Sequence, residues 1–298
     1  MILVLAHLLD AALGEPRWLW SRLPHPAVLM GRAVRLAEGY NTGTQRRLKG
    51  ALAVTALVMI AFGLGDLLSR LGPIVEILVL AILLAQRSLV EHVAAVARGL
   101  TESLAEGRRA VGMIVGRKTD TLGRADIIRA SIESGAENLS DGVIAPAFWY
   151  LIGGLPGVLV YKMVNTADSM IGYRTPQYED FGWAAARLDD VLNIAPARIT
   201  GVLIALASGK PRALRVMWRD ARQHRSPNAG WPEAAMAGAL DLALSGPRHY
   251  DTGPTDDPFL NPGGRHEGRV ADIDLATRLM WRAWGLWMIA LSVGFLLG

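Results

Sequence analysis

The stretch that decides the fold runs over residues 124–174 and reads RADIIRASIESGAENLSDGVIAPAFWYLIGGLPGVLVYKMVNTADSMIGYR. Runs of apolar residues alternate in it with clusters of acids and amides, and the same character continues to Asp190. Charged side chains beside lipid-like sequence are expensive to keep, so such residues are functional candidates by default. The polar clusters of this stretch are therefore the first place to look for a site.

The composition favours an integral membrane protein. Of the 298 residues, 51% are hydrophobic and only 19% are charged, which is more apolar than a typical soluble chain. The net charge of +4 predicts basic loops against anionic lipid, or substrates that carry phosphate. The absence of cysteine excludes disulfides, cysteine zinc sites and thiol nucleophiles. The six histidines are scattered without HExxH spacing, and no nucleic-acid motif is present, so we expect no nucleic-acid partner.

We expect an all-α, polytopic membrane protein with one domain over residues 1–298. Strand signals are almost absent, and Gly72-Pro73 predicts a tight hairpin between two helices. Helices are expected over residues 1–9, 51–68, 74–100, 123–138, 143–164, 183–193, 194–207, 231–245 and 283–297, with loops over residues 10–49 and 248–274.

The apolar stretch over residues 143–164 contains the breaker sequence GGLPG at residues 153–157. It divides the stretch into halves of roughly ten residues, each too short to span at about 1.5 Å per residue. Broken backbone is tolerated at membrane depth where it lines a protein cavity, so we expect a re-entrant pair of half-helices. This arrangement returns the chain to the side from which it entered, and the positive-inside rule favours the cytoplasmic side for the basic segment after Lys210.

Three acids are candidate magnesium ligands. Glu133 and Glu137 stand four residues apart, which puts both carboxylates on one face of a helix, and Asp141 follows beside Gly142. Mg²⁺ prefers one or two carboxylates together with substrate phosphates. The alternative is that Arg129 pairs with Glu133 and the remaining acids form a solvated face.

A second cluster lies around the sequence YKMVNTADSMIGYR. Lys162 and Asn165 share a helical face, and Asp168 follows at the next turn. Lys162 and Arg174 could clamp phosphate, whereas the alternative is that Asn165 or Thr166 simply caps a helix.

Further along the chain, Asp189 and Asp190 are adjacent, so on a helix they point roughly 100° apart. One is expected to face the site and the other to pair with a base. Asn228 and Trp231, in the sequence SPNAGWPE, are candidates for contact with a ligand. No P-loop and no GxGxxG turn is present, so a bound nucleotide would be held in another way.

Together these blocks resemble the CobD/CbiB family of cobalamin biosynthesis. The matching pieces are LGEP with PHPAVLMGR, VGRKTDTL, RASIESGAENLSDGVIAPAFWYLIGG, YKMVNTADSMIGY, FGWAAARLDDVLNIAPARITG and SPNAGWPEAAMAGAL, in the order of the family. The sequence departs from the family pattern at GRKTDT and at Leu139.

The resemblance implies a multi-pass inner-membrane adenosylcobinamide-phosphate synthase, a ligase that uses ATP and Mg²⁺. Because ATP and the corrinoid are cytoplasmic, we expect the polar clusters to face the cytoplasm. Such enzymes join aminopropanol, or its O-phosphate, to a propionate of adenosylcobyric acid, a corrinoid. Expected partners are these substrates, membrane lipid and other enzymes of the corrinoid pathway. For this chemistry we assign Glu137 and Asp141, with Glu133, to Mg²⁺, the side chains of Lys162, Arg174 and Arg187 to phosphate, and Asp168 or Asp190 to the base. A membrane phosphotransferase and a non-catalytic sensor or permease are the alternatives; the phosphotransferase pattern after Asp141-Gly142 is missing.

Overall fold

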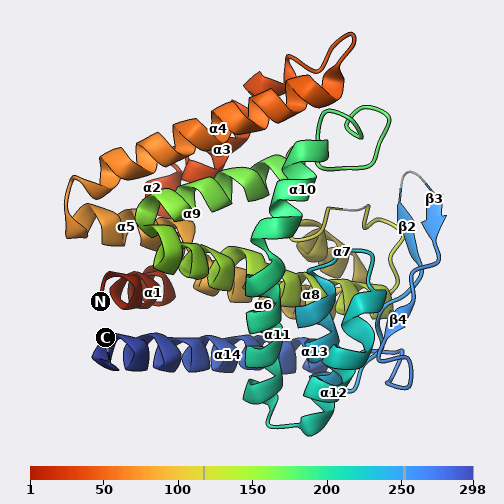
Figure 1. The fold of residues 1–298 in the computed structure, drawn as a ribbon. Helices are drawn as coiled ribbons and strands as arrows, with labels where there is room; N and C mark the ends of the chain where they lie inside the picture. Colours follow the sequence, from red (N-terminus) through yellow and green to blue (C-terminus); the bar gives the residue numbers. More distant parts are fainter. Residues whose placement is uncertain (117, 251–252, 298) are drawn as a thin grey trace. The chain divides into compact units, whose positions relative to one another are not determined.

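The computed structural model describes residues 1–116, 118–250 and 253–297 (Figure 1). About 74% of the chain is helical, which confirms the all-α prediction. The chain divides into two compact units, each built from two separate stretches. The first unit combines Met1–Ala85 with Asp141–Asn193, and the second combines Gln86–Ser140 with Ile194–Gly298. The expected single domain over residues 1–298 remains a prediction.

In its described residues the first unit contains helices joined by turns and loops, and no strand. Its helices are α1 (Ile2–Leu13), α2 (Arg17–Trp20), α3 (Pro26–Glu38), α4 (Arg46–Ser69), α5 (Pro73–Leu83), α9 (Ala145–Ile171) and α10 (Trp183–Leu192). The turn Ser140–Ile144 before α9 is a π-helix.

The expected loop over residues 10–49 is wrong, because this stretch contains α2 and α3 and the start of α4. Pro26 occupies the first turn of α3, where a missing N–H costs nothing. The Nδ1 of His25 accepts a hydrogen bond from the Ala27 N–H at 3.2 Å and so caps the helix. Met30 and Val34, one turn apart, bury the apolar side of the helix.

The hairpin at Gly72-Pro73 is confirmed. Gly72 has a φ of 100°, which favours glycine, and Pro73 begins α5. Farther back in α4, Gly65 lies against the backbone of Pro156, where a Cβ would be 2.5 Å from the Pro156 Cα. A glycine is therefore required for α4 to approach α9 this closely.

The break in α9 is also confirmed. Gly153 and Gly154 have non-helical dihedrals, and the φ of Gly154 is 57°. A Cβ on Gly157 would lie 2.5 Å from the carbonyl oxygen of Trp149. Eight residues of continuous helix would separate these positions by about 12 Å, so the two halves fold back on each other, as Figure 1 shows.

In its described residues the second unit contains the remaining α-helices and four short strands. The helices are α6 (Gln86–Glu102), α7 (Leu104–Gly112), α8 (Arg124–Leu139), α11 (Ile194–Ser208), α12 (Pro211–Asp220), α13 (Gly230–Leu240) and α14 (Val270–Leu297), with a 3-10 turn η2 at Ala221–Gln223. Strand β1 (Leu244–Ser245) pairs antiparallel with β4 (Phe259–Leu260), and β2 (Arg248–Tyr250) pairs with β3 (Gly253–Thr255).

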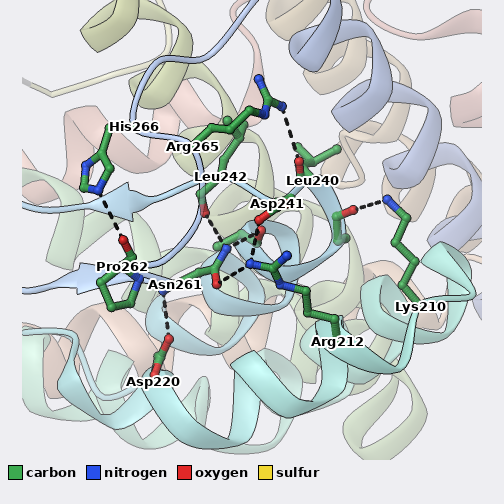
Figure 2. Close-up of polar contacts among 12 residues, drawn as sticks. Lys210, Arg212, Asp220, Leu240, Asp241, Leu242, Asn261, Pro262, Arg265 and His266 are labelled. Carbon is green, nitrogen blue, oxygen red and sulfur yellow. Dashed lines mark hydrogen bonds and ion pairs between the residues drawn. The ribbon is translucent and has the colours of Figure 1, made fainter.

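The helix expected over residues 231–245 ends early, at Leu240. Asp241 adopts a left-handed conformation with a φ of 57°, and the chain then enters β1. Figure 2 shows two contacts that hold this end: Lys210 donates to the Ala239 carbonyl at 2.7 Å, and Arg265 donates to the Leu240 carbonyl at 3.5 Å. Arg265 also pairs with Asp272 at 2.8 Å. Cations at a helix C-terminus complement its dipole, so the stop lies here and not at Gly246.

The C-terminal helix begins earlier than the sequence pattern predicts. Residues 248–274, expected to be a loop, contain β2, β3, β4 and the first turn of α14, which starts at Val270 instead of residue 283. Asp272 in that turn accepts a hydrogen bond from the Arg269 N–H at 2.6 Å, which caps the helix.

Several helical segments are long and apolar enough to cross a membrane. These are Arg46–Ser69, Pro73–Glu102, Arg124–Ile171 and Val270–Leu296. The consecutive helices α10 and α11 add a fifth segment if they count as one span. By length and composition the chain is therefore a polytopic membrane protein.

Candidate functional site

A network of polar side chains joins the second half of α9 to α10 in the first unit. Asn165 Nδ2 donates to Asp189 Oδ1 at 3.2 Å, and Asn193 Nδ2 donates to Asp189 Oδ2 at 3.0 Å. The hydroxyl of the buried Tyr161 donates to Asn193 Oδ1 at 3.0 Å. Both oxygens of the Asp189 carboxylate are thus held by amides within otherwise apolar helices.

The geometry follows from the helix period. Tyr161, Asn165 and Asp168 are spaced by four and three residues on α9, so they share one side of the helix. The indole Nε1 of Trp149, in the first half of α9, donates to the Leu192 carbonyl at 3.1 Å. This bond fastens the end of α10 beside the network.

Lys162 lies on the same half-helix and interacts electrostatically with Asp141 and Glu15. His25 belongs to this group as well. Burial lowers its pKa, Glu15 opposes that shift and the positive charge of Lys162 reinforces it. The structure therefore brings the predicted Lys162 and Asp141 together with two residues that our site prediction did not include. The signal for them was available in LGEP and PHPAVLMGR, which contain Glu15 and His25.

The adjacent acids of α10 have different partners, as the angular argument predicted. Asp189 accepts from Asn165 and Asn193, whereas Asp190 pairs with Arg187 at 2.9 Å. Arg174 also acts electrostatically on Asp190. Arg174, Arg187 and Asp190 are thus brought together, and the predicted roles of all three remain predictions. Asp189, which the sequence did not single out as the base, is the acid in the network.

Asp168 lies one turn beyond Asn165 and near the end of α9. Its charge acts on Tyr161. Its carboxylate packs against Gly172, where a Cβ would collide with it, so a glycine is needed at this position. The acid is held near the polar network by α9 itself, which is compatible with the expected role as a base.

The acids of α8 behave differently from one another. Glu133 is 5% exposed, and its Oε1 accepts a hydrogen bond from the Ser245 N–H of β1 at 2.6 Å. Glu137 is exposed. The alternative pairing of Arg129 with Glu133 is wrong, because Arg129 pairs with Asp126 at 2.5 Å.

A metal centre made by the protein alone is not evident. Residues 1–116, 118–250 and 253–297 contain no group of three or more His, Asp or Glu side chains placed to hold a metal ion. Mg²⁺ usually keeps several waters and takes one or two carboxylates plus substrate phosphates. The exposed Glu137 and the half-buried Asp141 fit that requirement better than Glu133, one oxygen of which is used by Ser245. Magnesium binding by these three acids remains a prediction.

Asn228 and Trp231, the other predicted ligand contacts, lie in the second unit and are buried. Arg198 donates to Asn228 Oδ1 at 3.3 Å, and its guanidinium carbon lies 4.5 Å from the centroid of the Trp231 ring. Trp218 contacts Trp231 edge to face, with ring centroids 5.2 Å apart. The sequence pattern found two members of this group and missed Arg198.

Comparison with known proteins identifies the family. A family model described as "CobD/Cbib protein" matches residues 3–280. The chain belongs to the CobD/CbiB family. It is 46% identical over 316 residues to the cobalamin biosynthesis protein CobD of Rhizobium meliloti, covering 99% of this chain and 97% of the relative.

Two other relatives agree with this assignment. The CobD protein of Brucella suis is 49% identical, with 100% of this chain and 98% of the relative covered. That of Rhodobacter capsulatus is 48% identical, with 95% and 93% covered. No solved structure matches the chain. Membership of the CobD/CbiB family gives the protein a role in cobalamin biosynthesis, with corrinoid-related substrates.

Proposed function

We propose that this CobD/CbiB protein is a ligase that uses ATP to form an amide between aminopropanol, or its O-phosphate, and a propionate of adenosylcobyric acid. The product is adenosylcobinamide or its phosphate. The observation that carries the proposal is the family match over residues 3–280. The polar network of α9 and α10, held inside apolar helices, supports it as the place where the reaction occurs.

The chemistry requires cations and a base from the protein. A carboxylate is a poor electrophile, so ATP first phosphorylates it and ADP leaves. The amine nitrogen then attacks the acyl carbon, and phosphate leaves from the tetrahedral intermediate. Cations must stabilise the transferred phosphoryl group, and a base must take the proton from the ammonium.

The residues of the first unit can supply these groups. We assign Lys162, Arg174 and Arg187 to the phosphoryl group and Asp168 to the base, with Asp190 as the alternative. Asn165 orients the site through its bond to Asp189.

Mg²⁺, when bound with ATP, would neutralise charge on the triphosphate. Glu137 and Asp141, with Glu133 as a third candidate, would hold it. Asn228 and Trp231 are assigned to ligand contact.

Growth of a strain that lacks the gene tests the proposal. Rescue by cobinamide but not by cobyric acid is expected, because the missing step lies between these two corrinoids. A strain rescued by neither compound would overturn the assignment. Amide formation by the purified protein, measured with aminopropanol and with its O-phosphate, would identify the amine.

The expected sidedness is part of the proposal, because ATP and corrinoid are cytoplasmic. The chain contains no native cysteine, so a single cysteine in place of the exposed Ser169 gives a clean test. We expect an impermeant thiol reagent to label this variant only after the inner membrane is permeabilised. Labelling in intact cells would refute the re-entrant arrangement of α9.

A further inference from the structure

Arg198, in the second turn of α11, is held in one orientation by its neighbours in the second unit. Its Nη1 donates to the Ile194 carbonyl at 2.6 Å and to Asn228 Oδ1 at 3.3 Å, and its guanidinium stacks over Trp231. Within the described part of the chain, its Nε and Nη2 make no hydrogen bond or ion pair. A planar cation is thus held through Nη1, and the N–H groups of two nitrogens, Nε and Nη2, remain available to a ligand.

A second cation lies near Arg198. Arg222 belongs to the turn η2, and its neighbour Ala221 packs against Gly230, where a Cβ would collide with the Ala221 carbonyl oxygen. The turn therefore lies against the segment that holds Asn228 and Trp231, and the positive charge of Arg222 acts on Arg198. Arg222 is exposed, and it makes no hydrogen bond or ion pair with residues 1–116, 118–250 or 253–297. Two like charges held near each other are unfavourable in the protein alone, and an anion bound between them would reverse the sign of the interaction.

The acids of this part of the second unit are already engaged. Asp220 accepts from Arg219 at 2.6 Å and from the Asn261 N–H at 2.8 Å. Glu233 lies 3.6 Å from His224, and both side chains are buried. Neither carboxylate forms an ion pair with Arg198 or Arg222 among the described residues, so these two acids leave both arginines available to an anion.

We propose that Arg198 and Arg222 bind the phosphate group of a soluble phosphate ester, with Asn228 and Trp231 positioning Arg198. The inference rests on the proposed function only for the choice of ligand, because ATP and aminopropanol O-phosphate both carry phosphate. The planar donor fork of arginine matches phosphate oxygens, and a dianion balances two cations.

Calorimetry on the purified full-length protein in detergent tests the site, with ATP and inorganic phosphate as probes. Arg222 has no structural partner among the described residues, so Arg222→Gln should fold normally and weaken phosphate binding about 10–100-fold. Arg198→Lys keeps the charge but loses the fork, and a smaller loss in the same direction is expected. Arg215→Gln, which removes an equally exposed arginine from the neighbouring α12, is the matched control and should bind like the wild type.

Three results would overturn the site. One is unchanged binding in both Arg222→Gln and Arg198→Lys. Another is an equal loss in Arg215→Gln, which would indicate a general charge effect. The third is that Arg222→Gln weakens binding of the protein to nanodiscs containing phosphatidic acid but does not change binding of ATP or inorganic phosphate. That result would assign the arginines to lipid headgroups.

Turnover measured in parallel separates this proposal from the proposed function. If the wild type forms the amide but Arg222→Gln binds phosphate as tightly as the wild type, the proposed arginine site is wrong and the proposed function stands. If the wild type forms no amide but Arg222→Gln still weakens phosphate binding, the proposed function is wrong and the arginine site is supported.

Discussion

Helix α8 and the second half of α9 both carry polar side chains at helical spacing within apolar sequence, yet they use them differently. In α8, Glu133 is buried and bonds a backbone N–H of β1, which fixes local structure. In α9, Asn165 bonds the side chain of Asp189, and Lys162, one turn before Asn165, interacts electrostatically with Asp141 and Glu15. A carboxylate satisfied by backbone is part of the scaffold, whereas a network of side chains with a nearby cation can serve a ligand.

The largest effect is expected from Lys162, because it is the cation of the α9 cluster. Lys162→Gln should lower turnover about 10²–10³-fold, the usual loss when one group that stabilises transition-state charge is removed. Purified protein assayed for amide formation at saturating ATP provides the measurement. Thermal unfolding should change little.

Ser169→Ala is the control for this variant. Among the described residues, its hydroxyl donates to the Asn165 carbonyl of the same helix, at 2.8 Å, and to no other group, and the residue is exposed. Turnover of Ser169→Ala should stay near the wild-type value. If the Lys162→Gln protein has normal turnover, the α9 cluster has a structural role, like the buried Glu133 of α8.

The fold was predictable where helix punctuation is local. The Gly72-Pro73 hairpin, the break at Gly153-Gly154 and the span of α8 follow from short-range rules about glycine, proline and periodicity. The early stop of α13 was not predictable, because Lys210 and Arg265 reach its end from distant parts of the sequence. The same reason explains the missed α3, whose proline and histidine look like loop residues but form its first turn.

The sequence predicted which polar residues belong to the candidate site better than it predicted their hydrogen-bond partners. The prediction that Asp189 and Asp190 have different partners was correct, but which acid meets Asn165 depends on how α10 packs against α9. The partner of Glu133 lies 112 positions away in sequence, so spacing within α8 gave no information about it.

A smaller effect should separate the two acids of α8. Glu133→Ala leaves the buried Ser245 N–H without its acceptor, which should cost about 1.5–3 kcal/mol of unfolding free energy. Glu137 is exposed, so Glu137→Gln should leave stability within about 0.5 kcal/mol while abolishing turnover through loss of Mg²⁺. Denaturant unfolding in detergent and turnover against magnesium concentration measure the two effects.

The reverse outcome would reassign the acids. If Glu133→Ala unfolds like the wild type, the bond to Ser245 is not structural. Glu137→Gln with normal turnover and normal magnesium dependence would make Glu137 a solvated surface residue.

The smallest effect tests the break that separates the halves of α9. Gly154 has a φ of 57° with a ψ of −152°, a conformation that a side chain strains, so Gly154→Ala should cost about 1 kcal/mol. Gly153 has a φ of −130°, and a Cβ there meets no atom within 4 Å, so Gly153→Ala should be nearly neutral. The two variants make the same chemical change one residue apart, so their difference in thermal midpoint isolates the backbone strain. Equal midpoints would mean that the backbone at Gly154 is not strained and that α9 does not turn back on itself there. The second half of α9 would then continue the first half as one helix, and the contrast with α8 would be lost.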